Sequence, residues 1–186
     1  MNITLPDGSV RTLDTGSSGH DLANDIGPGL AKAALAISVN GIQKDLSDPI
    51  NEDSEVSIIT IDSEEGLEIM RHTLTAQVLA RAVKNLYPDT KLAIGPTIKD
   101  GFYYDFEFVE SIAPDDLDKI EKEMQKIINS KSEITKKIHS KKDALKVFGS
   151  NGESYKESII NESNQEDNFQ LYYQDDDEFV DLCRGP

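Results

Sequence analysis

The spacing of apolar residues changes near residue 62, and this change constrains the fold more than any other feature of the chain. Before it, apolar residues come in short alternating runs broken by glycine and proline, as is typical of β-strands. After it, from Leu67 to Leu86, they recur every three or four residues, which predicts one long amphipathic helix. We therefore expect two organisations, a strand-rich block at residues 1–62 and an α+β block at residues 63–186.

In the first block, turn signals separate the predicted elements. Strands are expected at residues 3–5, 10–13, 36–39, from 42 onward and at 56–60, with one helix between the second and third. Ser17 or Ser18 caps that helix, and Gly27-Pro28-Gly29 is expected to end it. Asn40-Gly41 suits a two-residue hairpin loop because both positions tolerate positive φ. This order of elements predicts a β-grasp layer, a small sheet with one helix across its face.

The second block predicts long amphipathic helices packed on an antiparallel sheet. A second helix is expected from Pro114 because its apolar stripe continues to Ile128. Further elements are expected as two strands about a glycine turn in 93–106, a strand at 134–138, a short helix after Ser140, a helical turn after 152–156, and a hairpin of 169–173 with 179–182 across the acidic loop 175–178.

Charge and cysteine content exclude several classes of protein. The chain has 35 acidic and 19 basic residues, a net charge of −16, which disfavours a non-specific nucleic-acid or anionic-membrane binder. Its one cysteine, Cys183, excludes an intrachain disulfide. The start of the chain lacks the basic and then apolar run of a signal peptide, and no segment is apolar enough to span a membrane. A reducing cytoplasm is the expected location.

Lysines concentrate in one stretch of this acidic chain. Residues 131–146 carry six of them, and Lys136, Lys137, Lys141 and Lys142 are candidates for contacts with an RNA backbone. The alternative is that the lysines form only a solvated face. The sequence leaves both interpretations open.

Four motifs resemble a known family. They are L-E-I-M-R-H-T-L-T-A-Q-V-L-A-R-A-V-K at 67–84, A-I-G-P-T-I-K-D-G-F-Y-Y-D-F at 93–106, G-E-S-Y-K at 152–156 and F-V-D-L-C-R-G-P at 179–186. In this order they resemble the amino-terminal half of bacterial threonyl-tRNA synthetases, and the first block resembles the TGS domain of that family. The resemblance implies that residues 63–186 belong to an editing domain, which hydrolyses threonine tRNA mischarged with serine.

The resemblance also implies what lies outside this chain. The ATP-dependent aminoacylation domain, with its ATP, magnesium and zinc, and the anticodon-binding domain would follow residue 186. The chain would then be a fragment, monomeric by itself, of a homodimeric synthetase whose partner is tRNA.

Four residues match positions of the family's editing pocket: Lys156, Asp181, Tyr104 and Cys183. Lys156 in G-E-S-Y-K is expected to carry a positive charge toward a phosphate or an oxyanion. Asp181, on the same side of an extended strand as Cys183, is expected to accept hydrogen bonds from water or a ribose hydroxyl. Tyr104 offers an aromatic face and a hydroxyl to a terminal adenosine. Each also has an ordinary interpretation, as a surface lysine, an edge acid, a small buried thiol or a core tyrosine.

The family's paired histidines are altered. Aligned without gaps, the two histidine positions fall on Thr73 and Gln77, and His72 lies one place early. His72 and Tyr104 are the candidates for binding the substrate. At 3.6 residues per turn, His72 and Gln77 are expected on different faces of the helix. The family's further histidine would fall at residue 187, so no metal site is expected, because zinc requires three or four convergent ligands.

Three functions remain open from the sequence. The first is hydrolytic editing by the amino-terminal part of a synthetase, with Lys156, Cys183, Asp181, Gln77 and Thr73 as catalytic candidates, either active or attenuated by the altered histidine pair. The second is a non-catalytic tRNA-docking module. The third is a regulatory TGS protein of the nucleotide-stress-response type, which the position of the TGS-like block at the start of the chain disfavours.

Overall fold

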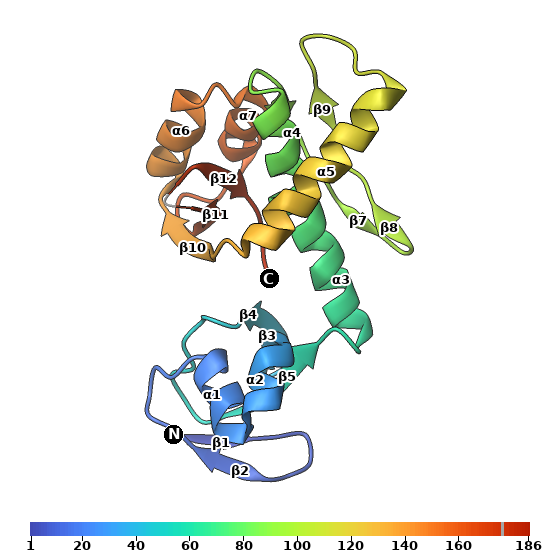
Figure 1. Cartoon of the computed structure of the whole chain (residues 1–186). Helices are drawn as coiled ribbons and strands as arrows, with labels where there is room; N and C mark the ends of the chain where they lie inside the picture. The colour runs from blue at the N-terminus through green and yellow to red at the C-terminus, as the bar shows by residue number, and fades with distance from the viewer. Residues whose placement is uncertain (176) are drawn as a thin grey trace. The chain divides into compact units, whose positions relative to one another are not determined.

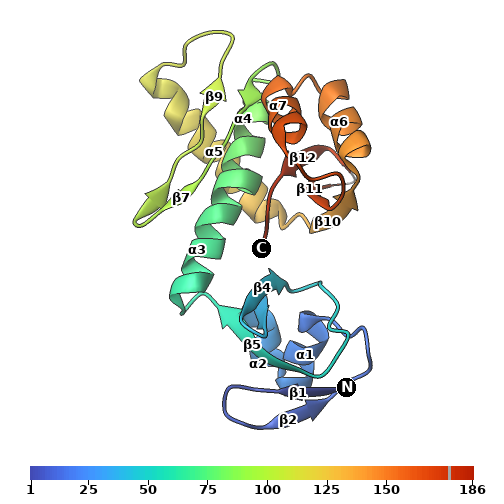
Figure 2. The same cartoon turned by 180° about the vertical axis from the view of Figure 1, so that it is seen from behind.

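The computed structural model describes residues 1–175 and 177–186, so Asp176 of the predicted acidic loop lies outside the described residues. Contacts divide the chain into unit 1, Met1–Met70 with Gly185–Pro186, and unit 2, Arg71–Arg184. Figures 1 and 2 show both units from opposite sides. The predicted α+β class is confirmed, since each unit combines helices with a sheet. None of the described helices is both long and apolar enough to cross a membrane.

Unit 1 is a five-stranded sheet with two short helices, in the order β2-β1-β5-β3-β4. Its elements are β1 (Asn2–Thr4), β2 (Val10–Thr12), α1 (Gly19–Ile26), α2 (Pro28–Ala33), β3 (Ala34–Val39), β4 (Ile42–Asp45) and β5 (Ser54–Thr60). The first and last strands, β1 and β5, pair in parallel, and the other pairs are antiparallel.

A capping box and a first-position proline explain where the two helices of unit 1 begin. The Ser18 side chain accepts from the Asp21 amide at 3.2 Å while the Asp21 carboxylate accepts from the Ser18 amide at 2.8 Å, a capping box that starts α1. The predicted end of this helix is confirmed, since α1 stops at Ile26 with Gly27 as its C-cap, but the expectation of a single helix is wrong, because a second short helix, α2, begins at Pro28. Proline is well suited to this first position, where its missing N–H would have had no helical partner.

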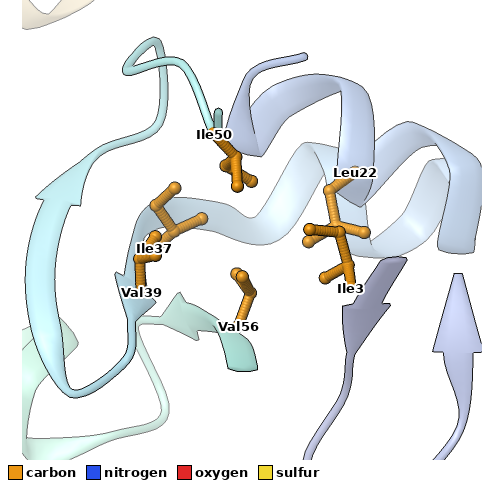
Figure 3. Packing of buried hydrophobic residues seen from close by; sticks show 6 residues of the cluster. All are labelled: Ile3, Leu22, Ile37, Val39, Ile50 and Val56. Carbon is orange, nitrogen blue, oxygen red and sulfur yellow. The ribbon is translucent and has the colours of Figure 1, made fainter. Parts of the chain in front are cut away.

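A single apolar cluster forms the core of unit 1. Its members come from β1, α1, β3, β5 and the loop before β5, and Figure 3 shows them meeting between the helices and the sheet: Ile3, Leu22, Ile37, Val39, Ile50 and Val56. The hydrophobic effect of burying this cluster stabilises unit 1 without disulfides.

The predicted long helix is present, but it contains an irregular turn. It consists of α3 (Glu64–Thr73), a π-helical turn η1 (Leu74–Leu79) and α4 (Ala80–Leu86). Although α3 begins close to the predicted boundary at 62, contacts change from unit 1 to unit 2 between Met70 and Arg71. The reason is that Ile69 of α3 packs on Ala36 and Ile59 in the sheet of unit 1.

Unit 2 continues from this helix with a second long helix and a three-stranded antiparallel sheet. The remaining elements are β6 (Lys91–Leu92), β7 (Thr97–Ile98), β8 (Gly101–Phe102), β9 (Phe106–Glu107), α5 (Pro114–Ser130), β10 (Ile134–His139), α6 (Lys141–Ser150), α7 (Ser154–Glu162), β11 (Phe169–Gln174) and β12 (Phe179–Leu182). The sheet has the order β10-β11-β12, and β6–β9 and β7–β8 form two small pairs.

The two faces of the three-stranded sheet have different partners. On one face, Leu171 and Tyr173 pack with residues of α6 and α7, among them Phe148 and Ile160. Because side chains alternate along a strand, Asp181 of β12 points to the opposite face. That opposite face meets the η1 and α4 part of the long helix, and it holds the candidate site.

Candidate functional site

Three predicted residues meet in the interior of unit 2. The Lys156 Nζ lies 2.7 Å from Asp181 Oδ1, and the two side chains are only 4% and 1% exposed. Lys156 Nζ also donates to the Tyr104 hydroxyl at 3.1 Å, and that hydroxyl donates to Asp181 Oδ2 at 3.2 Å. Residues from α7, β12 and the loop before β9 thus form one closed hydrogen-bonded triangle.

The surroundings keep the Tyr104 hydroxyl neutral. Burial raises the pKa of Tyr104 well above its ordinary value of 10.0, and the Asp181 carboxylate, then the charges of Glu153 and Cys183, raise it further. The Tyr104 ring stacks on Phe106 with centroids 4.6 Å apart. Gly95 is required beside it, because a Cβ at this position would lie 2.2 Å from Tyr104 Cδ2.

A thiol and an imidazole lie at the neighbouring end of β12. Cys183 Sγ is 3.5 Å from His72 Nε2 and 3.8 Å from Nδ1, and both residues are half-buried. The backbone N–H of Cys183 donates to the Gln170 carbonyl at 3.2 Å, which extends the β11–β12 pairing to this residue. His72, predicted as a substrate-binding candidate one place out of register with the family's histidine, is therefore the histidine that faces the cysteine.

The expectation that His72 and Gln77 lie on different helix faces is wrong. His72 contacts Cys183, and Gln77 contacts Gln174 of the adjacent strand, so both point to the β11–β12 hairpin. The reason is the π-helical turn, whose i to i+5 hydrogen bonds add a residue to the turn. A spacing of five across such a turn resembles a spacing of four in an α-helix.

The Gln77 amide is buried and fixed from one side. Gln174 Nε2 donates to both the backbone oxygen and Oε1 of Gln77, each at 2.8 Å. Arg81 NH1 donates in turn to Gln174 Oε1 at 3.0 Å. Gln77 Nε2 has no hydrogen-bond partner among residues 1–175 and 177–186. Thr73, the other predicted histidine position, is the half-buried last residue of α3, and its role stays a prediction.

The four candidate lysines do not share one environment. Lys137 Nζ lies 2.7 Å from Asp177 Oδ1 and 4.2 Å from the centroid of the Tyr173 ring. Lys141 Nζ donates to two backbone oxygens, of Asn161 and Ser163. These two lysines therefore have intramolecular partners. Lys142 is exposed on α6, and alternation along β10 places Lys136 on the face opposite Lys137. RNA contacts by these lysines stay a prediction.

Sequence reasoning missed two charged residues near the site. Glu153 is 4% exposed, and its carboxylate binds Lys84 Nζ at 2.7 Å and the Leu92 amide at 2.9 Å. Glu153 and Lys84 both lie inside motifs that the sequence analysis singled out, G-E-S-Y-K and V-L-A-R-A-V-K. The position of these two charged residues inside the motifs could have marked them as candidates, but only the folded structure shows that they pair with each other.

No metal centre is assembled in the part of the chain that the structure describes. Within it, no group of three or more His, Cys, Asp or Glu residues is placed to hold a metal ion. His72 and Cys183 supply two donors, fewer than a zinc site uses.

Comparisons with known proteins cover both units. The model of the TGS domain family matches residues 1–60. Proteins named threonine–tRNA ligase from Rhodospirillum rubrum and Nitrosococcus oceani are 45% and 46% identical over 184 residues, and one from Paramagnetospirillum magneticum is 49% identical over 185. Each alignment covers 99% of this chain and 28% of the relative.

The chain thus spans little more than a quarter of the length of the relatives it matches. The four motifs and the β-grasp block of the sequence point to the same group of proteins. The chain carries a TGS domain at its start, and nearly its whole length is about 45% identical to the amino-terminal region of bacterial proteins named threonine–tRNA ligase.

Proposed function

We propose that this chain performs hydrolytic editing, the removal of serine from mischarged threonine tRNA, as part of a threonine–tRNA ligase. The observation that carries the proposal is the buried Lys156–Asp181–Tyr104 triangle beside the His72–Cys183 pair. Charged groups are rarely buried unless they are paired, and they concentrate at functional sites.

Deacylation needs a proton acceptor for the attacking water and donors for the developing oxyanion. In this proposal the imidazole of His72, half-buried and next to Cys183, accepts the proton of the water. Lys156 and Tyr104 supply positive potential and a neutral hydroxyl, and Asp181 fixes both of them. Water attack forms a bond to the ester carbonyl carbon and breaks the bond to the ribose oxygen, and the proton held by His72 passes to that oxygen, so that serine and a free ribose hydroxyl are released.

The proposal assigns aminoacylation to other parts of the parent enzyme. The relatives are named as ligases, but this chain matches only 28% of their length. ATP, magnesium and zinc chemistry is therefore proposed for the remainder, and tRNA is the proposed common partner. Where the family has two histidines, this chain offers His72 and the amide of Gln77, so we expect slower editing than with an intact pair.

Hydrolysis of threonine tRNA charged with radiolabelled serine tests the proposal. We expect the chain to release serine faster than buffer does, and His72→Ala to slow release by about 100-fold, the lower range for losing a general base. Lys156→Ala should also abolish release, and Gln77→His should increase it. Thermal unfolding of each variant serves as the control for folding. If neither the chain nor Gln77→His releases serine, the editing assignment is wrong.

A tRNA-docking module without catalysis is the second candidate. It is favoured by Gln77, which stands where the family has a histidine and whose Nε2 is buried without a hydrogen-bond partner among residues 1–175 and 177–186. On this view Lys142→Glu, at an exposed lysine, weakens tRNA binding, and serine release is absent from the outset. Binding isotherms measured at two salt concentrations separate this outcome from editing, because phosphate contacts make affinity depend on salt.

A further inference from the structure

A second ion pair, with a buried carboxylate and a partly exposed ammonium, lies near the candidate site and makes no hydrogen bond to its triangle. The Glu153 carboxylate binds Lys84 Nζ through Oε1 and the Leu92 backbone N–H through Oε2. Lys84 Nζ also donates to the backbone oxygens of Pro88, at 2.8 Å, and Thr90, at 2.9 Å. We call this arrangement the Glu153–Lys84 clamp. Both oxygens of one carboxylate therefore tie together the end of α4, the following turn and β6.

The clamp is connected to both residues that bind Asp181, namely Lys156 and Tyr104. Glu153 is the N-cap residue of α7, and Lys156 lies in the first turn of the same helix. The clamp holds Leu92 of β6, which pairs with Phe106 of β9. The ring of Tyr104 stacks on that same Phe106. Movement at Glu153 would thus shift Lys156 through α7 and Tyr104 through the β6–β9 pair.

The chemistry of the clamp is specific to a carboxylate. Hydrogen bonds to ionised groups are roughly twice as strong as neutral ones, and here one anion receives one ammonium and one amide. An amide in its place keeps an acceptor for Leu92 but turns an NH₂ group toward the Lys84 ammonium. Two donors then face each other in a site that is largely closed to water.

We propose that Glu153 is a positioning residue for the candidate site: the Glu153–Lys84 clamp holds α7 and β6 so that Lys156 and Tyr104 meet at Asp181. The catalytic meaning of this positioning rests on the proposed editing function. The geometric claim stands independently of it, because the burial of Lys156 is itself measurable.

The test combines a chemical and a kinetic measurement on the full chain. Reductive methylation with formaldehyde, quantified by mass spectrometry at each lysine, reports access to Lys156. We expect Glu153→Gln to increase methylation of Lys156 by about tenfold, the factor that corresponds to about 1.4 kcal/mol. The exposed Lys126 should react as in the wild type. The matched control is Glu157→Gln, a change of the same chemistry one turn further along α7, which should leave Lys156 protected.

Hydrolysis of seryl-tRNA supplies the second readout. Because Glu153 binds Lys84 and Leu92 and acts on the triangle only indirectly, Glu153→Gln should lower kcat and leave KM unchanged. If the wild type shows no hydrolysis, the proposed function fails while the methylation result still decides the positioning. Should Glu153→Gln fail to fold, Lys84→Met breaks the clamp from the other side. The inference is overturned if the clamp variants fold and their Lys156 is as protected from methylation as in the wild type. It is also overturned if Glu157→Gln increases methylation of Lys156 as much as Glu153→Gln does.

Discussion

Removing one charge of the buried pair should destabilise unit 2 strongly. In Asp181→Asn the carboxylate becomes a neutral amide of the same shape, so the ammonium of Lys156 loses its counter-charge. With the two side chains 4% and 1% exposed and 2.7 Å apart, water cannot replace the missing carboxylate. Breaking a buried pair from one side costs about 3–5 kcal/mol. At about 4 °C per kcal/mol for a domain of this size, the midpoint should fall by about 10–20 °C.

The chain offers an optical signal that is confined to unit 2. It has no tryptophan, and all its tyrosines lie in this unit: Tyr87, Tyr103, Tyr104, Tyr155, Tyr172 and Tyr173. Urea unfolding followed by tyrosine fluorescence therefore measures unit 2 alone. Far-UV circular dichroism measures both units together. A midpoint that falls in the fluorescence signal, while part of the circular-dichroism signal unfolds as in the wild type, therefore shows that unit 2 alone is destabilised.

A double variant separates the charge from the packing. Combining Asp181→Asn with Lys156→Met removes both charges and should lose less stability than Asp181→Asn alone, since an unpaired buried charge costs more than an apolar replacement. The reasoning is refuted if Asp181→Asn lowers the free energy of unfolding by less than about 1 kcal/mol, the range of an exposed pair. It is also refuted if the two substitutions are additive, because residues in contact should couple.

Three further predictions follow from single contacts. The raised pKa of Tyr104 means that the folded state keeps a proton which the unfolded chain releases near pH 10.0, so the stability of unit 2 should decrease as pH rises above that value; urea unfolding up to about pH 11 should show a shallower decrease in Tyr104→Phe. Gly95→Ala should cost about 1–3 kcal/mol of unfolding free energy through its clash with Tyr104, whereas Gly101→Ala, with nothing within 4 Å, should not. Ser18→Ala should cost unit 1 about 1 kcal/mol. Because hydrogen bonds from Ser18 lower the pKa of Asp21 below 3.8, the difference in circular-dichroism unfolding between Ser18→Ala and wild type should shrink as pH falls below that value.

Local patterns predicted most elements of this fold. The period of apolar residues predicted the long helix and α5, and turn residues predicted the hairpin at Asn40-Gly41. The closing hairpin, β11 with β12, lies where the sequence predicted it. These features depend on neighbours within a few positions, so a single sequence contains their signal. The second helix of unit 1 escaped because Pro28 signals the end of one helix as readily as the start of another.

The candidate site depended on two kinds of information. Resemblance to a family singled out Lys156, Asp181 and Tyr104, but nothing in their spacing shows that they form one buried triangle. The histidine register was misjudged because a regular helix was assumed, whereas a π-helical turn aligns His72 with Cys183. A turn of this kind leaves no mark in the apolar period.

The sequence by itself determined where helices and strands form, where they are capped, and that the chain changes character near residue 62. Only the tertiary structure decided which charges pair, as in the buried pair Lys156–Asp181 and the partly exposed pair Glu153–Lys84. The physical reason is that whether a residue lies in a helix or a strand depends mainly on the residues near it in the sequence. Its burial and its partner are set instead by segments far away in the chain, which meet only when the core closes.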